Sequence, residues 1–322
     1  MNVLVTGATG FIGQALVGRL ADCPGVTVRA GVRRRSDVLP SLVTQVVVPE
    51  LGSGGDWHSA LAGVHSVVHL AARVHMTTDP SADPLSEYRR VNLEGTLSLA
   101  RQAASSGVRR FVFASTVKVN GESTRAERPF TESDAPAPAD AYGLSKAEAE
   151  AALFEVGATS GMEIVVIRPT LVYGPGVKAN FRSMTRWLQR GLPLPLGAIH
   201  HNRRSLIGID NLVDLILTCL RHPAAANEVF LAADGEDLST TGLLRRTAAA
   251  LGVQPRLIPV PAGLVALVAL LVGKRSAWRR LGGSLHVDIT KARTRLDWCP
   301  PVSVDEGLRR AVLPLMNAKR PE

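Results

Sequence analysis

The sequence has little cysteine, few aromatic residues and no long hydrophobic run. Its three cysteines, Cys23, Cys219 and Cys299, are scattered and show no CxxC spacing, so neither a disulfide framework nor a zinc site is indicated. We therefore expect buried free thiols and no bound metal. The longest apolar run, residues 262–272, has eleven residues, whereas a membrane-spanning helix needs roughly 20.

The N-terminus begins with strand-forming residues and lacks the basic region of a signal peptide. Together with the absence of a spanning segment, this indicates a cytoplasmic protein. The net charge of +9 does not by itself indicate a nucleic-acid partner, because the Lys and Arg residues form small scattered groups and aromatic residues make up only 4%. We expect no nucleic-acid binding, and the charge suits an anionic small molecule better.

Three glycines, Gly7, Gly10 and Gly13, follow a short β-rich run and precede a helical pattern. Gly7 permits a tight turn, Gly10 lets the backbone approach a pyrophosphate, and Gly13 lets helix and strand pack closely. The N-terminus of the following helix then faces the anion. This arrangement predicts a dinucleotide site.

Short apolar runs alternate with helical patterns along the first half of the chain. The runs that we expect to be strands are residues 26–32, 45–48, 66–71, 110–115 and 163–168. This rhythm predicts an α/β fold with a doubly wound, Rossmann-like parallel sheet and a ligand site at the carboxyl ends of its strands. Beyond residue 174, Gly and Pro clusters break the chain into shorter pieces. We expect a nucleotide-binding domain in residues 1–174, with a returning segment near 205–233, and a smaller, mainly substrate-binding domain in residues 175–322.

Tyr142 and Lys146 lie four residues apart in a predicted helix, and that spacing puts them on one face. We expect the helix to follow a loop at residues 132–141, with Asp140 as its cap. A phenol has a pKa near 10, and a neighbouring ammonium favours its ionised form. Such pairs are common on solvated helices, but this one accompanies the glycine turn and a Ser115–Thr116 pair that closes an apolar run. The combination predicts proton transfer in a nicotinamide enzyme.

Six ordered motifs resemble the extended short-chain dehydrogenase/reductases, and in particular the NAD-dependent epimerase/dehydratase family that acts on sugar nucleotides. The motifs are TGATGFIG at 6–13, HLAA at 69–72, VNLEGT at 91–96, FASTVKVNG at 113–121, YGLSK at 142–146 and RPTLVYGPG at 168–176. The resemblance runs from end to end of the chain. It is closest to bacterial polysaccharide-pathway members that are UDP-sugar 4-ketoreductases or UDP-hexose 4-epimerases.

The resemblance implies roles for individual side chains. Tyr142 would donate or accept a proton at the sugar C4 oxygen, and Lys146 would lower its pKa and hold the nicotinamide ribose. Thr116 would hydrogen-bond the same oxygen, with Ser115 as the fallback hydroxyl. The cofactor contacts implied are Gly7, Thr9, Gly10, Phe11, Ile12, Gly13, Arg33, Arg34, Glu50, Leu51, Leu70, Ala71, Ala72, Asn92, Tyr142, Lys146 and Pro169. The substrate contacts implied are Thr116, Lys118, Asn180, Arg204 and Arg279.

Several of these assignments carry an alternative. Arg204 would pair with the substrate diphosphate, because a guanidinium suits phosphate oxygens. Asn92 would fix the backbone near the Lys146 helix or a relay water, or else cap a helix. Arg33 and Arg34 stand where many NAD-preferring relatives have an acidic residue that takes the ribose hydroxyls. They would pair with a 2′-phosphate, which favours NADP over NAD, although a solvated basic turn gives the same sequence.

The two residues after the catalytic hydroxyl help to decide which reaction of the family this chain catalyses. Dehydratases of the family have Asp-Glu there, whereas this chain has Val117 and Lys118, so dehydration is disfavoured. We expect 4-keto reduction of a UDP-4-keto-6-deoxy-N-acetylhexosamine in polysaccharide (O-antigen or capsule) biosynthesis. The alternative is 4-epimerisation of UDP-glucose or UDP-N-acetylglucosamine. A noncatalytic NADP-binding sensor or scaffold is a third possibility, against which the retained Tyr, Lys and Thr argue.

The resemblance also implies a homodimer formed by two helices of each subunit, residues 85–105 and 141–156. The first helix carries Leu93, Leu97 and Ala100 at helical spacing. The second carries Ala147, Ala151 and Phe154 in the same way. Packing of either helix on the sheet would produce the same stripes.

Overall fold

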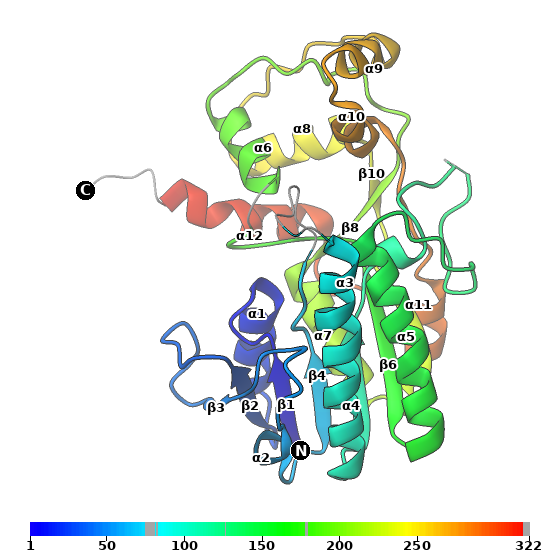
Figure 1. The fold of residues 1–322 in the computed structure, drawn as a ribbon. Helices are drawn as coiled ribbons and strands as arrows, with labels where there is room; N and C mark the ends of the chain where they lie inside the picture. The colour runs from blue at the N-terminus through cyan, green and yellow to red at the C-terminus, as the bar shows by residue number, and fades with distance from the viewer. Residues whose placement is uncertain (75–80, 82, 126, 178–179, 318–322) are drawn as a thin grey trace.

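A parallel sheet of seven strands forms the centre of the molecule (Figure 1). The computed structural model describes residues 1–322 except 75–80, 82, 126, 178–179 and 318–322. The order across the sheet is β3-β2-β1-β4-β5-β6-β9, and every neighbouring pair is parallel. The strands are β1 (Asn2–Thr6), β2 (Thr27–Val32), β3 (Thr44–Val47), β4 (Ser66–His69), β5 (Arg110–Ala114), β6 (Glu163–Pro169) and β9 (Glu228–Ala232). The predicted doubly wound α/β fold is confirmed.

The inner strands are apolar because helices cover both faces of the sheet. All four residues of β4 are buried, and so are six of the seven residues of β6. One face carries α1 (Phe11–Ala21), α7 (Ile209–Arg221) and α11 (Thr290–Leu296). The other face carries α2 (His58–Leu61), α4 (Gly95–Ser105) and α5 (Ala141–Ser160). The chain reverses its direction across the sheet between β1 and β4, and this switch point is where such folds bind ligands.

A second group of elements stands above the carboxyl ends of the strands (Figure 1). It contains a three-stranded sheet of order β10-β8-β7 and its own apolar clusters. Its strands are β7 (Leu171–Tyr173), β8 (Arg204–Gly208) and β10 (Asp237–Leu238). Its helices are α6 (Asn180–Gln189), α8 (Thr240–Ala250), α9 (Ala262–Leu271), α10 (Arg275–Gly282) and α12 (Val304–Asn317). The division at residue 174 stays a prediction.

Short helical turns complete the fold. α3 (Pro84–Arg89) continues through a π-helical turn, η1 (Arg90–Glu94), into α4. The 3₁₀ turn η2 (Val117–Val119) follows β5, and the 3₁₀ turn η3 (Pro223–Ala225) follows α7. Among the described residues, no helix is long and apolar enough to cross a membrane.

The three cysteines are all free, but they differ in exposure. Cys219 is buried on α7, as expected. Cys23 is only partly buried after the end of α1, and Cys299 is exposed in the loop beyond α11. The expectation of buried thiols is therefore wrong for these two, because neither lies on an element that packs into the sheet.

Candidate active site

The glycine turn between β1 and α1 leaves no room for a side chain at two of its positions. Gly7 has φ of +67°, and a Cβ on it would lie 2.7 Å from the backbone nitrogen of Ala71. A Cβ on Gly13 would lie 2.1 Å from the carbonyl oxygen of Gly7. α1 begins at Phe11 with no side-chain cap and no acidic residue in its first turn. Its open N–H groups and positive dipole end therefore fit a pyrophosphate.

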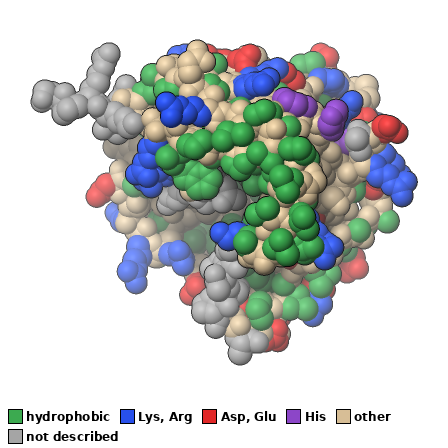
Figure 2. All heavy atoms as spheres, turned by 90° about the horizontal axis from the view of Figure 1, so that it is seen from above, with side chains coloured by type: hydrophobic (Ala, Val, Ile, Leu, Met, Phe, Trp, Pro, Cys, Tyr) green, Lys and Arg blue, Asp and Glu red, His purple; other side chains and the backbone are tan. Residues whose placement is uncertain are grey.

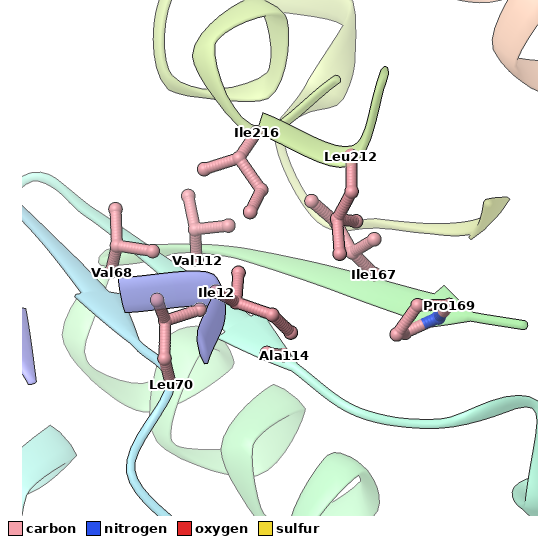
Figure 3. A pocket seen from close by; sticks show the side chains of 9 residues that line it. All are labelled: Ile12, Val68, Leu70, Val112, Ala114, Ile167, Pro169, Leu212 and Ile216. Carbon is pink, nitrogen blue, oxygen red and sulfur yellow. The ribbon is translucent and has the colours of Figure 1, made fainter. Parts of the chain in front are cut away.

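A small apolar cavity lies beside this turn, between the sheet and the α1 and α7 layer (Figure 3). Three predicted cofactor contacts line it: Ile12 of α1, Leu70 just after β4, and Pro169 at the end of β6. The complete lining is Ile12, Val68, Leu70, Val112, Ala114, Ile167, Pro169, Leu212 and Ile216. The fold thus brings together side chains that the sequence holds more than 150 residues apart, since Ile12 and Pro169 are 157 positions apart (169 − 12).

Two segments that carry predicted catalytic side chains meet at the start of α5. The carboxylate of Asp140 caps the helix by accepting from the Gly143 N–H at 2.7 Å, as predicted. A Cβ on Gly143 would lie only 3.1 Å from the carbonyl oxygen of Lys118. The turn that follows Thr116 therefore packs against the helical turn that carries Tyr142.

Lys146 is buried beneath this turn. Its Nζ donates to the carbonyl oxygen of Ala114 at 2.7 Å and lies 4.1 Å from the centre of the Phe113 ring. Burial lowers the pKa of the ammonium to about 7, while the nearby Glu150 carboxylate opposes the shift. The side chain is thus directed at the end of β5 and carries a proton only part of the time near neutral pH.

The pKa of Tyr142 is raised above its usual range. Burial is the main cause, and the charges of Asp140 and Tyr88 add to it. Lys146 is not among the groups that shift it. That Lys146 lowers this pKa stays a prediction; in this structure its ammonium bonds to the backbone carbonyl of Ala114.

A buried ion pair supports the site from below, and sequence reasoning missed it. Glu150 of α5 and Arg168 of β6 pair at 2.5 Å, and both are almost fully buried. The Ser115 hydroxyl donates to Glu150, and Arg168 donates to Asn120 Oδ1 at 3.0 Å. Ser115 therefore belongs to a structural cluster, which leaves Thr116 as the candidate hydroxyl. Two features of the sequence could have indicated this pair. Glu150 lies one helical turn after Lys146, and Arg168 is a charged residue in an otherwise apolar strand.

Asn92 is buried within the π-helical turn η1. Its Oδ1 accepts from the Arg73 N–H at 2.8 Å, and its Nδ2 donates to the Ser145 hydroxyl at 3.0 Å. It therefore ties the loop after β4 to the helix of Lys146, as the first of its two predicted roles requires, and it does not cap a helix. Its contact with a cofactor stays a prediction.

His69 ends β4 and is a second residue to which the sequence analysis gave no role. Its Nδ1 hydrogen-bonds with the Thr6 hydroxyl at 2.7 Å, and its Nε2 with the Thr96 hydroxyl at 3.0 Å. Burial, with a smaller effect from Lys146, lowers its pKa to about 3. This neutral imidazole links β1, β4 and α4 directly below the glycine turn.

The predicted contacts for the adenosine part lie at the ends of β2 and β3. Arg33 and Arg34 follow β2 and are exposed. Within the described part of the chain, no hydrogen bond or ion pair engages either of them. Glu50 is exposed, whereas Leu51 is buried against Gly95. The two arginines are therefore free to meet an anion.

The predicted substrate contacts are only partly brought together. Arg204 is partly buried at the start of β8, where burial lowers its pKa, and it has no carboxylate partner among the described residues. Lys118 forms ion pairs with Asp140 and Glu122. Arg279 is exposed on α10. Asn180 begins α6, and its side chain lies outside the described residues.

Comparison with known proteins gives one consistent result. Residues 3–233 match the model of the NAD dependent epimerase/dehydratase family. The UDP-glucose 4-epimerase of Vibrio cholerae is 45% identical over 317 residues, which cover 98% of this chain and 96% of that protein. The dihydroflavonol 4-reductase of Zea mays is 34% identical over 251 residues, or 70% of this chain and 68% of that one. The solved structure of the Thermus thermophilus UDP-glucose 4-epimerase with NAD is 25% identical, with a TM-score of 0.75 and coverage of 97% of this chain and 98% of that chain.

Proposed function

Because this chain belongs to the NAD dependent epimerase/dehydratase family, we propose that it is a 4-epimerase of a UDP-hexose such as UDP-glucose. The observation that carries the proposal is the 45% identity, over almost the full length of both chains, to the UDP-glucose 4-epimerase of Vibrio cholerae. This reverses the preference drawn from the sequence, which placed 4-keto reduction first and epimerisation second.

The cofactor site that the proposal requires fits the residues present. The open N-terminus of α1 and the close turn at Gly7 and Gly13 would hold the pyrophosphate. Ile12 and Pro169 would supply apolar contact for the rings. When bound, a nicotinamide cofactor supplies a reversible hydride acceptor at the sugar carbon.

The chain's own side chains would move the proton. In its deprotonated form, Tyr142 would take the proton of the C4 hydroxyl as that carbon is oxidised, and it would return this proton after the opposite face has been reduced. Thr116 would donate a hydrogen bond to the same oxygen. Lys146, with a pKa of about 7, can hold or release a proton beneath them. Arg204, which has no carboxylate partner among the described residues, would receive the diphosphate of the nucleotide.

An assay with two substrates tests the proposal. Given UDP-glucose and NAD, we expect the protein to form the C4 epimer while absorbance in the reduced-nicotinamide band shows no net change. The Tyr142→Phe variant is the control for contaminating activity. If the UDP-hexose is unchanged while UDP-4-keto-6-deoxy-N-acetylhexosamine is reduced at the cost of one NADPH per sugar, epimerisation is not the function.

Reduction by NADPH is the second candidate, and it is favoured by Arg33 and Arg34, which are exposed and have no partner in the described part of the chain. Two guanidinium groups at the end of β2 suit a 2′-phosphate, which NADP carries and NAD lacks.

The preference between the two cofactors can be measured as binding affinities of the double variant Arg33→Ala with Arg34→Ala. We expect this double variant to bind NADPH more weakly by roughly 1 to 3 kcal/mol while its affinity for NADH changes little, since charge-assisted hydrogen bonds to the phosphate are lost. Titration of nicotinamide fluorescence gives both constants. Arg35→Ala, in the same turn, is the matched control. Equal losses of affinity for NADPH and NADH would show that the turn does not recognise the 2′-phosphate and is ordinary basic surface.

A further inference from the structure

α9 is apolar along its whole length, yet most of its large side chains are exposed. Its sequence is AGLVALVALL, and none of its residues is buried. Leu267 is 51% exposed, Leu271 is 76% exposed, and Val272 just beyond the helix is 60% exposed. We call Leu264, Leu267, Val268, Leu270, Leu271 and Val272 the α9 patch. Contiguous apolar surface of this kind marks a binding surface more often than a solvated one.

The patch lies at the outer end of the second group of elements. Figure 1 places α9 at the top of the molecule, farthest from the seven-stranded sheet, with α10 beside it. Figure 2 views the molecule from that end and shows hydrophobic side chains gathered on this face with Lys and Arg side chains at the margin. This surface is thus separate from the candidate active site.

The charge around the patch has one sign. Residues 239–287 contain seven Lys and Arg residues and no Asp or Glu. Four of these cations, Lys274, Arg275, Arg279 and Arg280, directly follow α9 and are exposed. None of the four forms an ion pair with another described residue.

An apolar helix flanked by cations complements one kind of surface in particular. An anionic bilayer offers acyl chains to the leucines and headgroup phosphates to the Lys and Arg side chains. α9 has ten residues, and at 1.5 Å per residue its length is about 15 Å, half the thickness of a hydrocarbon core. The helix would therefore lie in the interface without crossing it.

We propose that the α9 patch and the cations at the start of α10 dock this protein on an anionic phospholipid bilayer. The leucines of α9 enter the boundary between headgroups and acyl chains, and Lys274 and Arg275 contact the phosphates. The glycine turn, Tyr142 and Lys146 at the carboxyl edge of the sheet stay in water, since they belong to other elements.

Co-sedimentation of the full chain with vesicles tests the proposal. We expect the protein to sediment with vesicles of phosphatidylglycerol and phosphatidylcholine, and much less with phosphatidylcholine alone. Leu267→Ser with Leu271→Ser should lower the partition coefficient by about ten-fold or more, because the inserted apolar groups are lost. Lys274→Gln with Arg275→Gln should lower it by roughly 20- to 30-fold, at about five-fold per cation.

A matched control separates docking from general surface hydrophobicity. Val38→Ser with Leu42→Ser replaces two side chains that are 57% and 92% exposed near β3, and it should change the partition less than two-fold. Circular dichroism checks that each variant is folded. The proposal is overturned if the wild type stays in solution, or if the α9 and control variants sediment alike. It is also overturned if no vesicle binding occurs and the α9 variant, unlike the control variant, has a lower mass than the wild type in light scattering.

Discussion

The two reactive side chains of α5 show how strongly burial acts on single residues. Burial raises the pKa of Tyr142 above its usual range and lowers the pKa of Lys146 to about 7. Both shifts favour the uncharged form of the group, since burial in the folded chain penalises its charge. Near neutral pH the pair therefore carries less charge than a solvated tyrosine and lysine, and it is Lys146 that can change its charge.

Replacing Tyr142 by Phe should stop turnover and leave the fold intact. Only the transferable proton is lost, and general acid or base groups of this kind contribute roughly 10² to 10⁴ to kcat. Steady-state kinetics with the sugar nucleotide gives the loss. Tyr88→Phe is the matched control, because that ring lies 6.0 Å from Tyr142 and its hydroxyl bonds to a backbone carbonyl. Comparable kcat values for the two variants would remove Tyr142 from the mechanism.

His69 should make the free energy of unfolding depend on pH below neutrality. In the unfolded chain it binds a proton near pH 6.5, whereas burial lowers its folded pKa to about 3. The unfolded state thus binds more protons between these values, and stability falls as the pH falls from 6.5 towards 3. Between pH 7 and pH 5 we expect His69 to account for a loss on the order of 1 to 2 kcal/mol.

Urea unfolding of the wild type and of His69→Gln at both pH values checks this. Other groups titrate in the same range, so the relevant quantity is the difference between the two proteins. The variant is less stable at pH 7, but it should lose less on acidification. If both proteins lose the same stability between pH 7 and pH 5, the buried imidazole does not cause the dependence.

At the scale of an element, α1 contains two glycines whose replacement by Ala should have opposite effects. A Cβ on Gly13 would lie 2.1 Å from the Gly7 carbonyl oxygen, whereas a Cβ on Gly18 would have nothing within 4 Å. We expect Gly13→Ala to abolish cofactor binding by displacing the turn. Gly18→Ala should stabilise the fold by roughly 0.5 to 1 kcal/mol, because Gly is costly within a helix. Calorimetric titration measures the NAD affinity of Gly13→Ala, and thermal unfolding measures the stability of Gly18→Ala. Normal NAD affinity in Gly13→Ala would refute the close-packed turn.

The strands could be predicted from the sequence, because a parallel sheet covered on both faces gives continuous apolar runs. The glycine turn and the cap at Asp140 were equally local signals. The pairing of Glu150 with Arg168 was not predictable, since it joins α5 to β6 and depends on how deeply the helix packs. The direction of the Lys146 side chain was not predictable for a related reason. Helical spacing places Lys146 on the same face, but the Ala114 carbonyl decides where its ammonium points.

At the scale of the whole molecule, the outer surface of α4 and α5 remains open for association. Leu97, Ala104 and Val156 line a hollow between these two helices. Ala151 is exposed on the outer face of α5. The predicted homodimer would cover this surface with the same pair of helices from a second copy.

Light scattering at micromolar concentration should give twice the chain mass of 34.2 kDa. Ala151→Arg should give the monomer, because a long charged side chain prevents close approach of two helices. The control is Ala21→Arg, an equally exposed position at the end of α1 on the other layer. A monomer mass for the wild type would contradict the prediction outright.

The position of β9 has a consequence for synthesis on the ribosome. β9 pairs with β6, yet residues 170–227 lie between the two strands in sequence. At 5 to 20 residues per second, a ribosome needs roughly 3 to 12 s to deliver that stretch. Throughout that interval the nascent chain presents the apolar edge of β6 without its neighbour, and an open edge recruits other strands. A gene truncated after residue 174 should therefore yield inclusion bodies instead of a separate nucleotide-binding domain.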